Sequence, residues 1–281
     1  MKIFITTSLL FIIQFFSAQD ENSFYGNGVF NYEENKIQKI FVDQTRIRES
    51  PNINAKILDS LSSNHQVLIL KKENAFLKLG ERYANWYKIS YQKNEVTNEG
   101  YVWGGNLCVG FRHKNGLDFL FGIPKTVNKK DKNISEETFS QNMASIKALE
   151  GNHLLDEVSF NTGTGESLSY ATFSVESNHK LNDVELTLNA HVSGEACGVA
   201  SYTQYVLFSD KKLIALPQLM NVGDADVFYH SEEFVFPNDK GGIPNAFIFK
   251  MEEMEKDEKE REKKKRASKT YLWNGNSYKL K

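Results

Sequence analysis

The chain has 281 residues and a formal net charge of −2 at pH 7. Phosphate backbones are bound by concentrated positive charge, so this balance argues against a nucleic-acid partner. Aromatic residues make up 12% of the chain and proline is scarce, as in a folded protein, and the length predicts two domains.

The first residues have the layout of a cleavable export signal. Lys2 supplies a positive charge, residues 3–16 are mostly apolar, and Ser17-Ala18 offers small side chains before the chain turns polar. The apolar run is shorter than the roughly 18 residues of a membrane-spanning helix, and no later stretch approaches that length. We therefore expect cleavage after Ala18 and a periplasmic or secreted protein with no membrane span. The alternative is a buried or anchoring N-terminal helix.

Residues 41–109 have the pattern of a small barrel, preceded by an N-terminal extension at residues 19–40. Residues 67–70 form a compact apolar run, Trp86–Tyr91 alternates bulky faces, and Gly100–Trp103 resumes a strand after a polar turn. Five or more short strands within about 70 residues favour a closed β-barrel.

The motifs in this segment resemble the bacterial SH3 (SH3b) family. Ile47, Arg48 and Pro51 match the family's opening motif, in which Ser-Gly is usual where Glu49-Ser50 stands here. A Trp-Tyr-Lys-Val element is matched by residues 86–89, and a Gly-Tyr-Val element by residues 100–102. The resemblance is confined to residues 41–109.

Many SH3b modules recognise peptides or glycans of the bacterial cell wall, and others only dock or support neighbouring parts. The resemblance therefore implies a binding protein whose partner is wall peptide, wall glycan or an envelope protein. An extended stretch at residues 71–85 and a polar insertion before Gly100 depart from the family pattern. Specificity carried by loops is therefore not transferred.

Aromatic side chains supply the physical argument for a ligand site. Tyr87, Tyr101 and Trp103 offer flat apolar faces with a polar handle, on which sugar C–H faces can stack. Arg48 is the charged candidate, although a structural ion pair or backbone tether is its other interpretation. Neighbouring strand residues point to opposite faces, so part of this set belongs to the core, and Trp86 is expected there.

Residues 110–281 are predicted to form an antiparallel β-rich domain. Lys114-Asn115-Gly116 is a turn signal, and Val184–Val192 alternates apolar and polar residues as a strand with one wet face does. Further strands are expected at residues 154–160, 202–208, 212–216, 227–229, 234–236 and 246–249, with a final hairpin around residues 274–276.

Two segments of this domain are predicted to be helical. Apolar side chains recur at helical spacing between Phe139 and Leu149, so residues 136–149 are expected to form a short amphipathic helix. Residues 252–269 are acidic first and basic later, with opposite charges four residues apart, which suits a solvated or partner-binding helix. The predicted fold is therefore mainly β: a small SH3-like barrel, then an antiparallel β-rich domain with one short helix and a charged helical excursion.

The chain has two cysteines, Cys108 and Cys197. An oxidising compartment permits a disulfide between them, which would close a loop of about 90 residues and add roughly 4 to 5 kcal/mol in the chain-entropy model. Two unpaired buried thiols are the alternative.

No constellation in the sequence matches a catalytic or metal centre, and no cofactor is predicted. A cysteine hydrolase needs an activated thiol beside a histidine, and Cys197 with His179, His191 or His230 is the available set. The residues around Cys197 do not resemble the Asp-Cys-Ser-Gly motif of the NlpC/P60 peptidases. The sequence therefore favours a non-catalytic binding protein, with a cell-wall thiol hydrolase as the alternative. The sequence does not distinguish a non-catalytic envelope-binding protein from an inhibitor or immunity-type partner protein.

Overall fold

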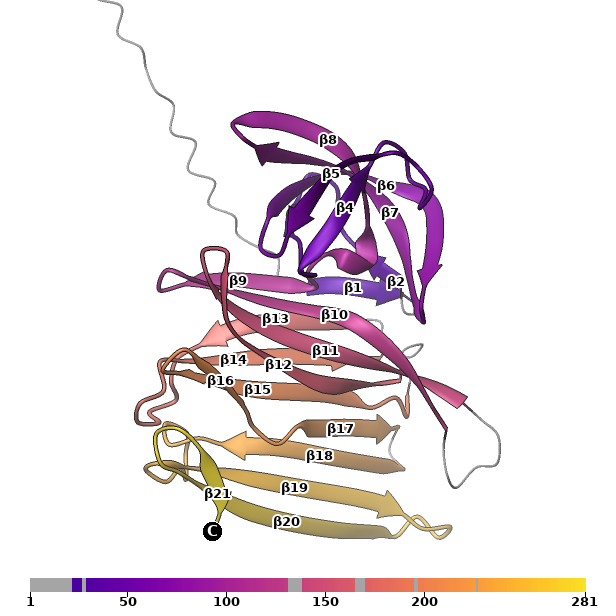
Figure 1. The fold of residues 1–281 in the computed structure, drawn as a ribbon. Coiled ribbons are helices and arrows are strands. Elements are labelled where there is room, and N and C mark those ends of the chain that lie inside the picture. Colours follow the sequence, from indigo (N-terminus) through magenta and orange to yellow (C-terminus); the bar gives the residue numbers. More distant parts are fainter. Residues whose placement is uncertain (1–21, 27–28, 131–137, 165–169, 195–196, 226) are drawn as a thin grey trace, which may run out of the picture.

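The protein is an elongated stack of strands with a curled half-barrel at one end (Figure 1). The computed structural model describes residues 22–281 except 27–28, 131–137, 165–169, 195–196 and 226. The mainly β prediction is confirmed, because strands account for 68% of the chain and helices for 1%. The predicted signal segment, with its cleavage point after Ala18, lies outside the described residues. Within the described ranges, no helix is long and apolar enough to cross a membrane.

The half-barrel contains strands that pair antiparallel in the order β5, β4, β8, β7, β6 and β3. Their bounds are β3 (Ile37–Lys39), β4 (Gln44–Arg48), β5 (Ile57–Ser62), β6 (Gln66–Leu79), β7 (Arg82–Lys93) and β8 (Val96–Trp103). A short 3₁₀ turn, η1 (Gly104–Asn106), follows β8. The side chains inside the curl include Ile47, Ile69 and Ile89, which are fully buried.

A long antiparallel sheet runs away from the half-barrel. Its strands are β1 (Asn22–Gly26), β2 (Val29–Asn31), β13 (Tyr170–Glu176), β14 (Leu186–Ser193), β15 (Ser201–Ser209), β16 (Lys212–Ala215), β17 (Leu219–Asp224), β18 (Phe228–Val235), β19 (Ala246–Lys256), β20 (Glu262–Trp273) and β21 (Tyr278–Leu280). β1 pairs with both β13 and β2, and β2 pairs in parallel with β7 of the half-barrel. The segment predicted as an extension thus supplies β1 and β2 to the long sheet and β3 to the half-barrel.

A second sheet covers one face of the long sheet (Figure 1). It consists of β9 (Gly110–Lys114), β10 (Leu117–Lys130), β11 (Thr138–Glu150) and β12 (His153–Thr164), paired in chain order. Phe119 packs edge-on against Phe208 at 5.2 Å between ring centroids, and Phe121 stacks on Phe173 at 5.6 Å. These rings fill the space between two layers, as in a β-sandwich.

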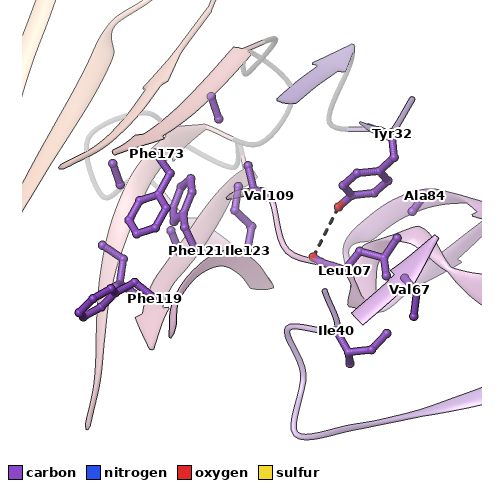
Figure 2. Packing of buried hydrophobic residues seen from close by; sticks show 14 of the residues in the cluster. Tyr32, Ile40, Val67, Ala84, Leu107, Val109, Phe119, Phe121, Ile123 and Phe173 are labelled. Atoms are coloured by element: carbon purple, nitrogen blue, oxygen red, sulfur yellow. Dashed lines mark hydrogen bonds between the residues drawn. The ribbon is translucent and has the colours of Figure 1, made fainter. Parts of the chain in front are cut away.

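One hydrophobic core continues from the half-barrel into the sandwich. Figure 2 shows Ile40 and Leu107, which pair as an isolated antiparallel bridge just after β3 and η1, followed by Val109, Ile123 and Phe121. All five side chains are buried and belong to the same packed cluster. The predicted domain boundary after residue 109 therefore falls within a shared core.

The predicted helix at residues 136–149 is wrong, because the described residues from 138 onward form β11. Ala144, Ile146 and Ala148 pack into the sandwich core, while Lys147 and Leu149 on the other face are also buried, against Phe41 and its neighbours. A strand covered on both faces loses the alternation of apolar and polar residues. Its apolar positions can then match the helical period by chance.

The predicted charged helix at residues 252–269 is also wrong, because these residues form the hairpin of β19 and β20. Glu252 lies directly opposite Arg266, and their side chains form an ion pair of 2.7 Å. Asp257 and Arg261 close the turn with a second ion pair of 2.8 Å. An acidic strand followed by a basic strand pairs opposite charges across the hairpin, as a helix would along one face.

The local turn signals are confirmed. Asn115 and Gly116 adopt φ values of 54° and 78° between β9 and β10, as a two-residue hairpin turn requires. Gly275 (φ 102°) lies in the predicted turn between β20 and β21. The predicted wet face of β14 is partly covered instead, since Thr187 on that face is fully buried.

Candidate functional site

Two of the four predicted ligand residues lie in the core. Tyr87 is fully buried, its hydroxyl accepts a hydrogen bond from the Tyr32 backbone N–H at 3.2 Å, and burial raises the pKa of Tyr87 to about 12. Trp103 is 2% exposed, and its Nε1–H donates to the carbonyls of Leu77 and Ala84 at 3.2 Å each. These polar handles are satisfied internally, so Tyr87 and Trp103 do not form the exposed aromatic platform that was predicted.

The other two predicted residues face each other across β4 and β8. Tyr101 is half-buried and lies opposite Arg48. Arg48 is 9% exposed, and its guanidinium donates to the Ala55 carbonyl at 2.7 Å, which is the tether named as its alternative role. Trp86 is 4% exposed and is a core residue, as predicted.

A cleft of about 230 Å³ opens on the half-barrel beside Arg48. Its lining residues come from β4, the β4–β5 connection, the end of β6, the paired strands β7 and β8, and η1: Gln44, Thr45, Arg46, Arg48, Ile53, Leu79, Trp86, Trp103 and Asn106. Trp86 lies opposite Trp103 in the β7–β8 register, so both indoles lie on the same face of the strand pair and line the base of the cleft. The exposed side chains of Gln44 and Arg46 stand at the rim.

Arg46 differs from Arg48 in its partners. Both residues lie on β4, but the register with β5 shifts between Ile47 and Arg48, so the alternation of faces breaks there and Arg48 is buried while Arg46 is exposed. Arg48 is tethered, whereas Arg46 is exposed and makes no hydrogen bond or ion pair within the part of the chain that the structure describes. The cleft therefore combines an indole base with a charged guanidinium that is available to an anionic ligand.

A half-buried arginine contacts the indole of Trp103. The guanidinium of Arg82 lies 4.8 Å from the centre of the Trp103 ring and donates to the carbonyls of Gly105 and Ile123. Burial lowers the pKa of Arg82 to about 10. These contacts hold Trp103 against η1 and so preserve the shape of the cleft.

Sequence reasoning missed Gln44 and Arg46 as site residues. The signal was present in the alternation of Gln44 and Arg46 with Thr45 and Ile47 on a predicted strand. The prediction relied on the aromatic residues instead. A strand pattern does not indicate which face of a curled sheet remains open to a ligand.

The two cysteines are free in the structure, as in the second of the two alternatives, although only Cys108 is buried. Cys108 is fully buried, and burial raises the pKa of its thiol. Cys197 is exposed. A buried thiol of raised pKa is a poor nucleophile, which leaves Cys197 as the reactive candidate.

The three candidate histidines have other partners. A ring nitrogen of His191 lies 2.9 Å from Thr203 Oγ1, and one of His179 lies 3.0 Å from Glu176 Oε2. Among the described residues, no histidine is hydrogen-bonded to Cys197, and no group of three or more His, Cys, Asp or Glu side chains could hold a metal ion. The thiol-hydrolase alternative stays a prediction.

We expect His230 on β18 to make the stability of the protein depend on pH. Its ring nitrogens lie 3.1 Å from Glu253 Oε2 and 3.1 Å from Glu232 Oε1. Burial lowers the pKa of His230, but the two carboxylates together raise it more, so the net shift is upward. The charged imidazolium therefore stabilises the folded protein fully below the unfolded-state pKa of about 6.5, and this gain is lost as pH rises through the folded-state pKa.

The measurement is urea denaturation of the wild type and His230→Gln over a pH series. The free energy of unfolding of the wild type should exceed that of His230→Gln by the largest amount near pH 6. The difference should then fade above neutral pH. A difference that is constant across the series would show that His230 is not charged in the folded protein.

Comparisons with protein families, with curated proteins and with solved structures gave no match to this chain.

Proposed function

We propose that the protein is an exported, non-catalytic binding protein of the bacterial cell envelope, whose ligand site is the cleft on the half-barrel. The observation that carries the proposal is the cleft itself, which Arg46, unpaired among the described residues, lines together with Trp86 and Trp103. The apolar, short N-terminal segment supports export, and the resemblance of residues 41–109 to SH3b modules supports a role in binding.

The chemistry of the cleft favours peptide over neutral glycan. A guanidinium binds a carboxylate through paired hydrogen bonds, and the stem peptides of bacterial walls carry free carboxylates and short aliphatic side chains. Ile53, which is 40% exposed, and the uncovered edges of the two indoles offer an apolar surface to such a side chain, and Gln44 offers an amide donor and acceptor. A volume of about 230 Å³ suits a peptide end rather than a long saccharide.

Arg46→Ala should weaken binding to purified wall sacculi by about tenfold or more, because a hydrogen bond to a charged group contributes about 1.5–3 kcal/mol. The measurement is co-sedimentation of the purified protein with sacculi over a concentration series. Arg261→Ala, at an exposed arginine in the β19–β20 turn at the far end of the molecule, is the matched control and should bind like the wild type (Figure 1).

Two results would contradict this function. Wild-type protein that does not sediment with sacculi would exclude the wall as its partner. Equal binding by Arg46→Ala and the wild type would exclude the cleft as the site.

A further inference from the structure

Strand β20 forms an open edge of the long sheet (Figure 1). It pairs with β19 along its whole length, but β21 covers its other side only at Tyr271–Trp273. Residues 262–269, which we call the basic edge, are all exposed. A strand edge of this length is a template for another strand.

The hydrogen-bond pattern shows which backbone groups of the basic edge are open. The Trp273 N–H donates to the Asn245 carbonyl on the β19 side, whereas the Thr270 carbonyl accepts from the Lys281 N–H on the outer side. The β19–β20 register has no bulge, so the inward and outward groups alternate without a break. The N–H and C=O groups of residues 262, 264, 266 and 268 therefore point outward.

The side chains of the basic edge carry an excess of positive charge. Glu262 is its acidic residue, against the five basic residues Lys263, Lys264, Lys265, Arg266 and Lys269. Arg266 pairs with Glu252 and Lys264 with Glu262. Lys263 and Lys265 have no ion pair within the described ranges, and they lie on the opposite face of the strand from Arg266.

A groove of about 640 Å³ crosses one face of the sheet, from Tyr229 and Ser231 on β18 over β19 to Arg266, Ala267 and Ser268 on β20. It lies on the inner side of the basic edge and does not extend beyond it. Open backbone groups and charge on both faces together define a strand-docking site.

We propose that the basic edge binds an acidic, extended segment of a partner protein, which adds to the sheet as a further strand next to β20. Outward N–H and C=O groups at residues 264 and 266 supply backbone hydrogen bonds. The lysines select acidic side chains, with Lys263 and Lys265 on one face and Lys264 on the other. This site is independent of the cleft on the half-barrel.

The same charges disfavour a second copy of this chain as the occupant. In antiparallel pairing of two basic edges, residues that point outward oppose each other, so a register centred on Lys265 would place Lys264 opposite Arg266 of the other copy, and like charges directly opposite are destabilising. Lysines on an exposed edge are a known guard against self-association. An acidic strand meets no such barrier.

The test is fluorescence anisotropy of a labelled peptide of alternating Glu and Val, titrated with the full-length protein. The Glu peptide should bind the wild type, and a matched Gln/Val peptide should bind at least about tenfold more weakly because the charge complement is lost. Added salt should strongly weaken the binding of the Glu peptide to the protein.

Lys264→Pro separates backbone docking from charge alone. Proline removes an N–H that points outward and leaves the hydrogen bonds to β19 in place, so the hairpin should fold. Lys264→Pro should bind the Glu peptide about tenfold or more weakly than the wild type does. Lys264→Ala keeps the N–H, so its affinity for the peptide should fall less. Circular dichroism checks that both variants are folded.

Amide exchange gives a readout that does not depend on the variants. The amides of Lys264 and Arg266 should exchange quickly in the free protein and become protected with the Glu peptide. Equal binding of Glu and Gln peptides, wild-type binding by folded Lys264→Pro, or self-association of the wild type through this edge would each overturn the proposal.

Discussion

Phe121→Ala is expected to lower the free energy of unfolding by about 3–5 kcal/mol, as for a fully buried ring. Phe121 on β10 is 0% exposed and stacks on Phe173 at 5.6 Å and on Phe160 at 6.3 Å. It lies in the core that links the two sheets and continues towards the half-barrel (Figure 2). Removing the ring costs its transfer free energy and leaves a cavity that a packed two-layer core cannot close.

The measurement is chemical denaturation followed by tryptophan fluorescence and by circular dichroism. Trp86 and Trp103 lie in the half-barrel but Trp273 lies on β20, so the fluorescence is recorded in a Trp273→Phe background. A fluorescence transition that then shifts together with circular dichroism would show that the shared core unfolds as one unit. Phe76→Ala is the matched control, because this phenylalanine is 51% exposed and its loss should cost far less. Equal losses at the two positions, or a fluorescence transition that does not move, would contradict a shared core.

Lys39→Met is expected to destabilise the protein by about 3–5 kcal/mol, because it leaves a largely buried carboxylate without its cation. Lys39 Nζ on β3 lies 2.8 Å from Asp118 Oδ1 on β10 and 2.7 Å from Asn64 Oδ1. Only 11% of the Lys39 side chain and 14% of the Asp118 side chain are exposed. Asn64 also donates to Asp118 and to the Gly151 carbonyl, so the network joins the half-barrel to the sandwich.

The loss should depend on pH. Burial raises the pKa of Asp118, but its bonds to Lys39, Asn64 and His113 outweigh burial and hold it below the ordinary value. A depressed folded-state pKa stabilises the protein above the unfolded value of about 3.9, and this gain is lost as pH falls through the folded-state pKa. The difference between Lys39→Met and the wild type should therefore be largest at neutral pH and shrink in acid.

Two variants control the Lys39 result. Lys211→Met breaks a surface pair with Glu150 whose side chains are more than half exposed, and it should change stability by no more than about 1 kcal/mol. The double variant Lys39→Met/Asp118→Leu removes both buried charges and should be more stable than Lys39→Met alone. If Lys39→Met and Lys211→Met cost the same, the junction network does not stabilise the fold.

Local chemistry was enough to predict much of this protein. The turn at Asn115-Gly116 needs two residues that tolerate positive φ, and that requirement is visible in any sequence. The strand at Val184–Val192 was recognisable for a similar reason, since one of its faces packs into a core and its apolar residues alternate. Features determined by neighbours along the chain could thus be read from the sequence alone.

Tertiary structure decided what depends on the second face of a strand. β11 looked helical because the sandwich buries Ala144 and Ile146 while the half-barrel junction buries Lys147, which erases the period of two. Residues 252–269 carry charges that pair equally well along a helix or across a hairpin, and the pairing of β19 with β18 selects the hairpin. Neither choice is available to a chain segment considered alone.

The same distinction between local and tertiary determinants applies to the residues of the candidate site. From sequence, Trp86 was expected in the core and Arg48 was given a tether as its alternative, and the structure places both in those roles. Which aromatic rings would be sealed was decided by the curl of β7 and β8, which buries Tyr87 on one face and Trp103 on the other. Sequence alone determined the turns and those strands that keep one face open, because both depend on neighbours along the chain. Strands covered on both faces, and the place where a ligand can bind, were decided by contacts between residues far apart in the chain.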